Sequence, residues 1–141
     1  MHQATNILSA IKTALTGLGT TGVNVYQTRA YPINPTPALS IRLSSIDPVR
    51  QISNAFLDSF VDVDVLIHVS GSSETLDAEI LQIDAEVYAA LMADRTLGGV
   101  AIELDPQTLT VESSAETEEP TALGLRRWRV HMRHSITSAE A

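Results

Sequence analysis

The sequence predicts one α+β domain, residues 1–141, in which an antiparallel β-sheet of four to six strands carries two helices on one face. Three observations lead to this fold class. Apolar residues recur at helical spacing in two segments, and elsewhere they alternate with polar residues as in half-buried strands. These segments follow the order helix, strands, helix, strands, with connections of hairpin length. The length of 141 residues suits a single domain, and no linker or repeat divides the chain.

The first third of the chain is predicted to contain a helix, two strands and two loops. Apolar spacing predicts the helix over 4–17, and short apolar runs predict strands over 23–26 and 38–43. Three prolines in 31–37 lack the backbone donor of a central strand, so we expect a stiff, extended loop there. The polar segment 44–54 contains an Asp-Pro turn signal and is predicted to be a long connection.

The segment 57–69 shows the clearest strand pattern. Its odd positions are almost all apolar, whereas its even positions include three aspartates and a histidine. This period of two predicts one buried face and one wet, acidic face. The acidic face would carry Asp58, Asp62, Asp64 and His68.

A second helix and two further strands are predicted in the next part of the chain. A serine cap, acidic residues in the first turn and a long apolar stripe predict the helix over 74–94. Strands are expected at 100–104 and 109–111, on either side of a turn at Asp105-Pro106. The acidic segment 112–120 has the composition of a solvated loop tip.

The final strand, predicted over 123–136, separates arginines from apolar side chains. Its apolar face contains Trp128, and a single tryptophan in that setting is predicted to lie in the core. The other face presents Arg127, Arg129, His131 and Arg133.

The composition excludes or disfavours several classes of function. The chain has no cysteine, which excludes disulfides, thiolate metal sites and cysteine nucleophiles. Nine basic residues against seventeen acidic ones give a net charge of −8, which disfavours general nucleic-acid binding. No apolar run approaches the roughly 18 residues of a membrane helix, and the N-terminus shows no secretory signal. We therefore expect folding in the cytoplasm and no membrane partner.

The sequence contains no recognisable catalytic motif. It has no nucleophile elbow, zinc-protease helix or phosphate-binding glycine loop, so we expect no enzyme, no catalytic residue, no metal and no cofactor. His131 and His134 are three residues apart on a strand and should point to opposite faces. Two readings from other classes stay open: a small metal-dependent hydrolase using Asp62, Asp64 and His68, and a ligand-binding domain using the proline-rich loop.

The arginine and aspartate rows would face each other if their strands were neighbours. Opposite charges directly across strands contribute roughly 0.2–1 kcal/mol per pair, and paired guanidinium groups keep spare donors for another chain. The sequence leaves open whether the rows pair within the chain, dock to other subunits or are simply solvated. Tyr31 is a further candidate because rigid loops often make contacts. The candidates for contact with another subunit or with a larger assembly are Arg127, Arg129, Arg133, Asp58, Asp62, Asp64 and Tyr31.

The order of the elements resembles that of a known protein family. A short helix precedes Thr28-Arg29-Ala30-Tyr31-Pro32, and a proline-led strand begins with Pro37-Ala38-Leu39-Ser40-Ile41. A long strand, a helix containing residues 83–91 and an arginine-bearing final strand complete the order. Over nearly the whole chain, this order resembles the tail terminator, or tail completion, proteins of long-tailed bacteriophages and prophages.

The resemblance implies a structural protein of the virion. Members of this family are small α+β proteins that assemble into a six-membered ring on the last ring of the tail tube. The ring stops tube growth and presents a docking surface to the head connector; it has no catalytic residue and no cofactor, and DNA only passes through its channel. The resemblance therefore implies a homo-oligomer at the head–tail junction, with the tail tube protein and a head-completion or connector protein as partners. A head–tail connector or another minor tail protein is the alternative within the same class.

Overall fold

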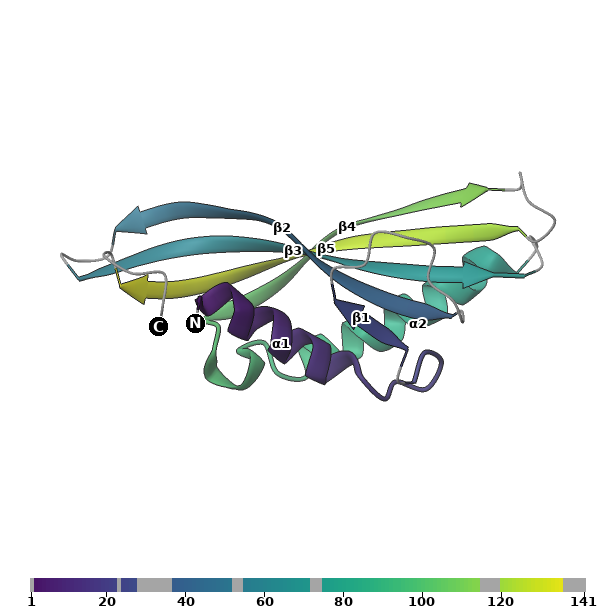
Figure 1. Cartoon of the computed structure of the whole chain (residues 1–141), viewed down its shortest axis with the longest axis horizontal. Helices are drawn as coiled ribbons and strands as arrows, with labels where there is room; N and C mark the ends of the chain where they lie inside the picture. The colour runs from purple at the N-terminus through teal and green to yellow at the C-terminus, as the bar shows by residue number, and fades with distance from the viewer. Residues whose placement is uncertain are drawn as a thin grey trace.

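One five-stranded sheet and two helices make up the described part of this chain. The structure, a computed structural model, describes residues 2–22, 24–27, 37–51, 55–71, 75–114 and 120–135. Both helices lie on the same side of the sheet (Figure 1), so the predicted α+β fold with two helices on one face is confirmed. The elements are α1 (Gln3–Leu15), β1 (Val25–Gln27), β2 (Ala38–Gln51), β3 (Phe56–Ser70), α2 (Leu76–Met92), the short 3-10 helix η1 (Leu97–Gly99), β4 (Glu103–Ser114) and β5 (Thr121–Ser135).

The sheet is mixed, whereas the sequence predicted an antiparallel one. Its strand order is β1-β2-β3-β5-β4. The pairs β2–β3, β3–β5 and β4–β5 are antiparallel, but β1 is parallel to β2, with Val25 beside Leu39. A parallel pair needs a crossover connection in place of a hairpin turn. β1 ends at Gln27 and β2 begins at Ala38, so more residues separate them than a hairpin turn would need.

Two strands continue through segments that were predicted to interrupt them. β2 runs through most of the predicted connection at 44–54, and β4 runs through the predicted turn at Asp105-Pro106. The register shifts between Leu43 and Ser45 and between Pro48 and Arg50 in β2, and between Pro106 and Leu109 in β4. Such irregularities let a strand accommodate a proline or an extra residue without ending. Both predictions were therefore wrong.

Some predictions fall on residues that the structure does not describe. The proline-rich loop, including Tyr31, lies outside the described residues except for Pro37. Residues 115–119 of the predicted acidic loop also lie outside them, and β4 occupies the first part of that segment.

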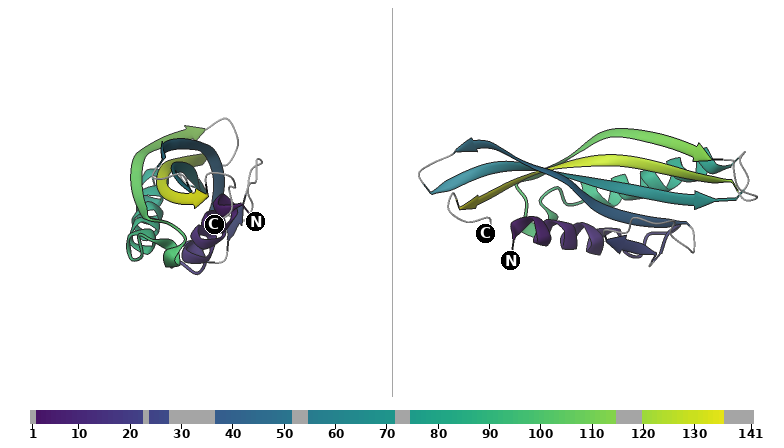
Figure 2. Two further views of the ribbon diagram at one scale, coloured as in Figure 1. Left: turned by 90° about the vertical axis from the view of Figure 1, so that its left-hand side faces the viewer. Right: turned by 45° about the horizontal axis from the view of Figure 1, so that its top comes forward.

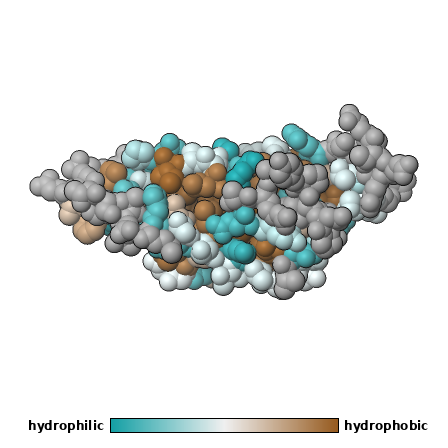
Figure 3. Space-filling model, viewed as in Figure 1, coloured by the Kyte–Doolittle hydropathy of each residue, from teal (hydrophilic) through white to brown (hydrophobic). Residues whose placement is uncertain are grey.

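The hydrophobic core fills the space between the sheet and the helices. The odd positions of β3 from Val61 to Val69 are buried, and Trp128 on β5 is fully buried, as predicted. α1 packs on β1 and β2, while α2 packs on β3, β4 and β5. On the surface drawn in Figure 3, hydrophobic residues near the middle of the face lie beside hydrophilic ones. The predicted apolar stripe of α2 is buried in this core: Leu76, Ile80, Ile83, Val87 and Leu91.

The other face of the sheet is open in the described part of the chain. Viewed along its long axis, the sheet is strongly twisted, and both helices remain on one side of it (Figure 2). At one end, β2, β3 and β5 extend beyond the helices (Figure 1). Neither described helix has the length and apolar character needed to span a membrane. The predicted charged rows of β3 and β5 lie on the open face.

Gly124 marks a close approach between β5 and α2. A Cβ atom at this position would lie 2.7 Å from Ile80 Cγ2 and 3.6 Å from Ile67 Cβ. Overpacking of this kind costs typically about 1–3 kcal/mol. We expect Gly124→Ala to lower the free energy of unfolding by that amount in urea denaturation.

Gly19→Ala is the matched control for this substitution. Its Cβ would lie 3.4 Å from Oε1 of the Glu86 side chain, which is ordinary van der Waals contact with a flexible group. The control should change stability by less than Gly124→Ala does. Equal effects of the two substitutions would contradict the packing explanation.

Candidate functional site: a charged network on the open sheet face

Three aspartates of β3 are buried on the open face of the sheet. Asp58, Asp62 and Asp64 are only 5%, 4% and 1% exposed. The sequence predicted a wet acidic face, and this prediction was wrong. β3 lies between β2 and β5, and side chains from these neighbours cover the carboxylates. Burying a charge is costly unless it is paired and hydrogen-bonded, so the covering groups must supply donors.

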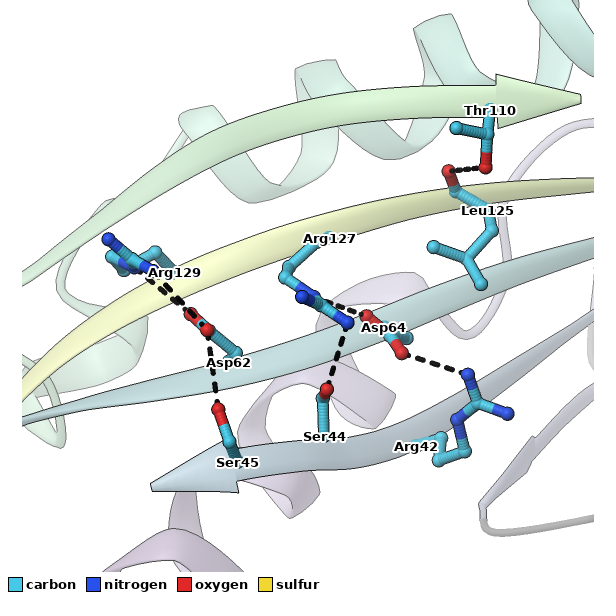
Figure 4. A network of polar contacts seen from close by, with 9 residues as sticks. All are labelled: Arg42, Ser44, Ser45, Asp62, Asp64, Thr110, Leu125, Arg127 and Arg129. Atoms are coloured by element: carbon cyan, nitrogen blue, oxygen red, sulfur yellow. Dashed lines mark hydrogen bonds and ion pairs between the residues drawn. The ribbon is translucent and has the colours of Figure 1, made fainter. Parts of the chain in front are cut away.

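The register between β3 and β5 brings the two charged rows together. Asp64 lies opposite Arg127, Asp62 opposite Arg129, and Asp58 opposite Arg133. Residues directly opposite each other on antiparallel strands project from the same face. The condition under which the rows would pair within the chain is therefore met, and Figure 4 shows the central part of the network.

Asp62 and Arg129 form a forked ion pair. Arg129 Nε donates to Asp62 Oδ1 at 3.0 Å, and Arg129 Nη2 donates to Oδ2 at 3.3 Å. The hydroxyl of Ser45 on β2 donates to the same Oδ2 at 3.3 Å (Figure 4). The guanidinium carbon of Arg129 also lies 5.2 Å from the ring centre of Phe60, a cation–π distance. The orientation of this arginine is fixed from two directions.

Asp64 links three strands through two arginines. Arg127 Nε donates to its Oδ1 at 3.0 Å, and Arg42 Nη2 on β2 donates to its Oδ2 at 2.9 Å. Arg127 Nη2 donates in addition to the Ser44 hydroxyl at 2.9 Å (Figure 4). The carboxylate of the central strand therefore holds a cation from each neighbouring strand.

Asp58 completes the row near the start of β3. Arg133 Nε donates to its Oδ1 at 2.7 Å and Nη2 to its Oδ2 at 3.3 Å, while His131 Nε2 lies 2.8 Å from Oδ2. Hydrogen bonding by Arg133 is the main cause that holds the pKa of Asp58 below its ordinary value, and burial opposes it. The same bonds raise the pKa values of the arginines: Arg127 through Asp64, Arg129 through Asp62, and Arg133 through Asp58.

The arginines form the outer layer of this network. The side chains of Arg42, Arg127, Arg129 and Arg133 are 41–51% exposed, whereas those of their aspartate partners are at most 7% exposed. A partner approaching the middle of this face therefore meets guanidinium groups before it meets carboxylates. Each guanidinium has five donors and retains some of them for an acceptor on another molecule. The network suits docking to carboxylates or other anions.

The structure does not bring Asp62, Asp64 and His68 together as a metal site. The oxygens of Asp62 and Asp64 accept hydrogen bonds from arginines, and His68 Nε2 lies 3.0 Å from the buried Ser40 hydroxyl. Burial lowers the pKa of His68. Within the described ranges, no group of three or more histidines and carboxylates is placed to hold a metal ion. His131 bonds to Asp58 on the open face and His134 to Ser59 on the other, so their predicted opposite orientation is confirmed.

Three β2 residues of the network were not predicted from the sequence: Arg42, Ser44 and Ser45. Arg42 is isolated in the sequence and gave no sign of joining the row, because the β2–β3 register that places it opposite Asp64 was unknown. Arg126 belongs to the helix side and binds Asp84 of α2 through two hydrogen bonds of 2.8 Å. The sequence contained a signal for this difference, because Arg126 occupies an even position of β5 whereas the arginines of the row occupy odd positions.

The Asp58 ion pair predicts an acid dependence of stability. Because the pKa of Asp58 is lowered from 3.8 in the folded chain, its contribution is present above that value and is lost as the pH falls through the folded pKa. We expect the free energy of unfolding, measured in urea between pH 2 and 7, to fall less steeply below pH 4 in Asp58→Asn than in the wild type. Identical slopes would contradict the pairing.

The Arg129–Asp62 pair predicts strong energetic coupling. Arg129→Met leaves a buried carboxylate without its main donors and should cost roughly 1–3 kcal/mol. A double-mutant cycle with Asp62→Asn should then give a coupling of at least about 0.5 kcal/mol. The pair Arg95–Glu103, with side chains 41% and 50% exposed at 2.8 Å, is the matched control and should couple more weakly. A larger coupling in the control would contradict the importance of burial.

Comparison with known proteins assigns no family to this chain. The chain matches no family model and no curated protein sequence. The charged network and the arrangement of the sheet are therefore the observations from which function can be inferred.

Proposed function

We propose that this chain is a tail terminator protein of a long-tailed phage or prophage. It forms a ring, of six copies in the family it resembles, that caps the tail tube, stops its polymerisation and offers a docking surface to the head connector. The observation that carries the proposal is the order of elements. The order α1, three strands, α2, two strands within one α+β domain is the order on which the resemblance to this family rests.

The charged network supports a docking role. Each arginine of the row is held by a buried aspartate, so its guanidinium group has lost much of its freedom before a partner arrives. Groups that are already ordered lose less entropy on binding. The half-exposed arginines therefore form a rigid surface with donors to spare, as assembly onto a tube or a neighbouring subunit requires.

The net charge supports a role around a DNA channel. The chain carries a net charge of −8. A ring of such chains would repel the phosphate backbone, so DNA could pass without sticking. The few exposed cations of the sheet face are held by carboxylates and are better suited to protein contacts than to nucleic acid.

Purification and mixing with the tail tube protein test this proposal. We expect closed rings in negative-stain images and a solution mass near six times the 15.2-kDa chain. Tubes polymerised in its presence should be shorter and should carry a ring at one end. An unrelated acidic protein of similar size is the control and should leave tube length unchanged. A strictly monomeric chain that never contacts tube ends would contradict the proposal.

A further inference from the structure

α2 has a second apolar side that faces away from the core. Leu81 is 57% exposed. Tyr88, at the border of this side, is 40% exposed, but its ring also packs against the buried Trp128, with 5.7 Å between the ring centres. At 100° per residue Leu81 and Tyr88 share this outward side with three exposed alanines, and Gln82 is the polar residue among them. A helix that is apolar on opposite sides is typically covered on both of them. The outer stripe, as we define it, consists of Ala78, Leu81, Ala85, Tyr88 and Ala89.

Acidic residues flank the outer stripe on both sides. Asp77 and Asp84 lie along one flank, and Glu79 and Glu86 lie along the other. Asp84 is paired with Arg126, and Glu86 accepts hydrogen bonds from Thr20. α2 itself contains no basic residue. Arg126 of β5 lies 5.7 Å from the ring centre of Tyr88 and offsets the charge of Asp84 on that flank. With four carboxylates against one guanidinium, the borders of the outer stripe keep a net negative charge, and the stripe fits a partner with cations among apolar groups.

The open sheet face of the same chain has the complementary character. Its outer layer is the arginine row, whose guanidinium groups are backed by long aliphatic stems and by Phe60. The lengths also agree: the 17 residues of α2 span about 25 Å. The strand segment from Arg127 to Arg133 spans about 20 Å.

The long edges of the sheet are poorly suited to pairing with another chain. β4 forms one edge, and among the described residues β2 pairs with β1 only over Leu39–Ile41. β2 contains Pro48 and β4 contains Pro106, each next to a register shift. Arg95 Nε also donates to the Leu104 carbonyl at 3.2 Å. Prolines and bulges are devices that discourage edge-to-edge pairing, so contacts through the faces are favoured.

We infer that the outer stripe of α2 packs on the arginine-covered sheet face of a second copy of this chain. This inference rests on the proposed ring and names the surfaces that would build it. The helices and the open face lie on opposite sides of one sheet, so the contact is head-to-tail. Repeated head-to-tail contacts form a ring when the rotation between copies closes.

Two single substitutions disrupt the two sides of this contact separately. Leu81→Glu places a charge in the outer stripe, and Arg42→Glu reverses a half-exposed charge on the sheet face while Arg127 still holds Asp64. Each should weaken self-association at least about ten-fold in sedimentation velocity. Ile102→Glu, at a position 43% exposed outside both surfaces, is the matched control and should leave association unchanged. Circular dichroism checks folding, and Arg42→Gln is the milder second variant.

Mixing the two defective variants tests the head-to-tail geometry. The Leu81→Glu chain keeps an intact sheet face, and the Arg42→Glu chain keeps an intact outer stripe. Their equimolar mixture should therefore form a dimer of about twice the 15.2-kDa chain mass, although each variant alone stays monomeric. A mixture that remains monomeric would overturn the inferred contact.

The outcomes separate this inference from the proposed function. Rings that persist in Leu81→Glu overturn the contact and leave the tail terminator proposal standing. Rings of Leu81→Glu that no longer stop tubes assign the outer stripe to the tube protein and overturn the contact as well. Head-to-tail association of the wild type without any effect on tubes supports the contact and contradicts the tail terminator. A wild type that stays monomeric alone and with tubes overturns both.

Discussion

The burial of three carboxylates on the central strand is the constraint on which the rest of the sheet depends. Asp62 and Asp64 accept hydrogen bonds from both neighbours of β3, and Asp58 is held by Arg133 and His131 of β5. A register slip of one residue would turn the arginines of β5 into the core and their partners away from them. The network therefore specifies which strands are neighbours and how they align, a role better attested for buried charges than added stability.

Stability and specificity come from opposite faces of the same strands. On the helix side, β3 and β5 bury valines, isoleucine, methionine and Trp128, and this apolar burial drives folding. On the open side, the ion pairs repay little more than the cost of desolvating the aspartates, since half of each arginine stays in water. The ion pairs on the open side instead fix the positions of the arginine side chains. These cations are positioned by the fold before any partner is present, which links the internal register to the external surface.

The sequence pattern was sufficient to predict the strands in which polar and apolar residues alternate. It was insufficient to predict the full length of the strands that contain register shifts. Period two in β3 and β5 predicted both strands, the buried Trp128 and the opposite orientations of His131 and His134. The Asp-Pro pairs in β2 and β4 suggested turns, yet bulges absorb them within continuous strands. The aspartates were predicted to be wet because a single strand's pattern does not reveal what its neighbours place above it. Arg42 was missed for the same reason: its role depends on a register between distant segments.

The two surfaces of the sheet differ in a way that gives the molecule a direction. The helix layer presents an apolar stripe bordered by acids, and the open face presents arginines over buried carboxylates. Like surfaces would repel or leave donors unpaired, whereas unlike surfaces satisfy each other, so the self-association that we infer would be directional. The proposed ring on a tail tube would need this property, because its subunits would have to bind one another sideways and still leave both ends of the ring free. Blunted strand edges serve the same purpose, since open edges would favour indefinite sheet extension over a closed assembly.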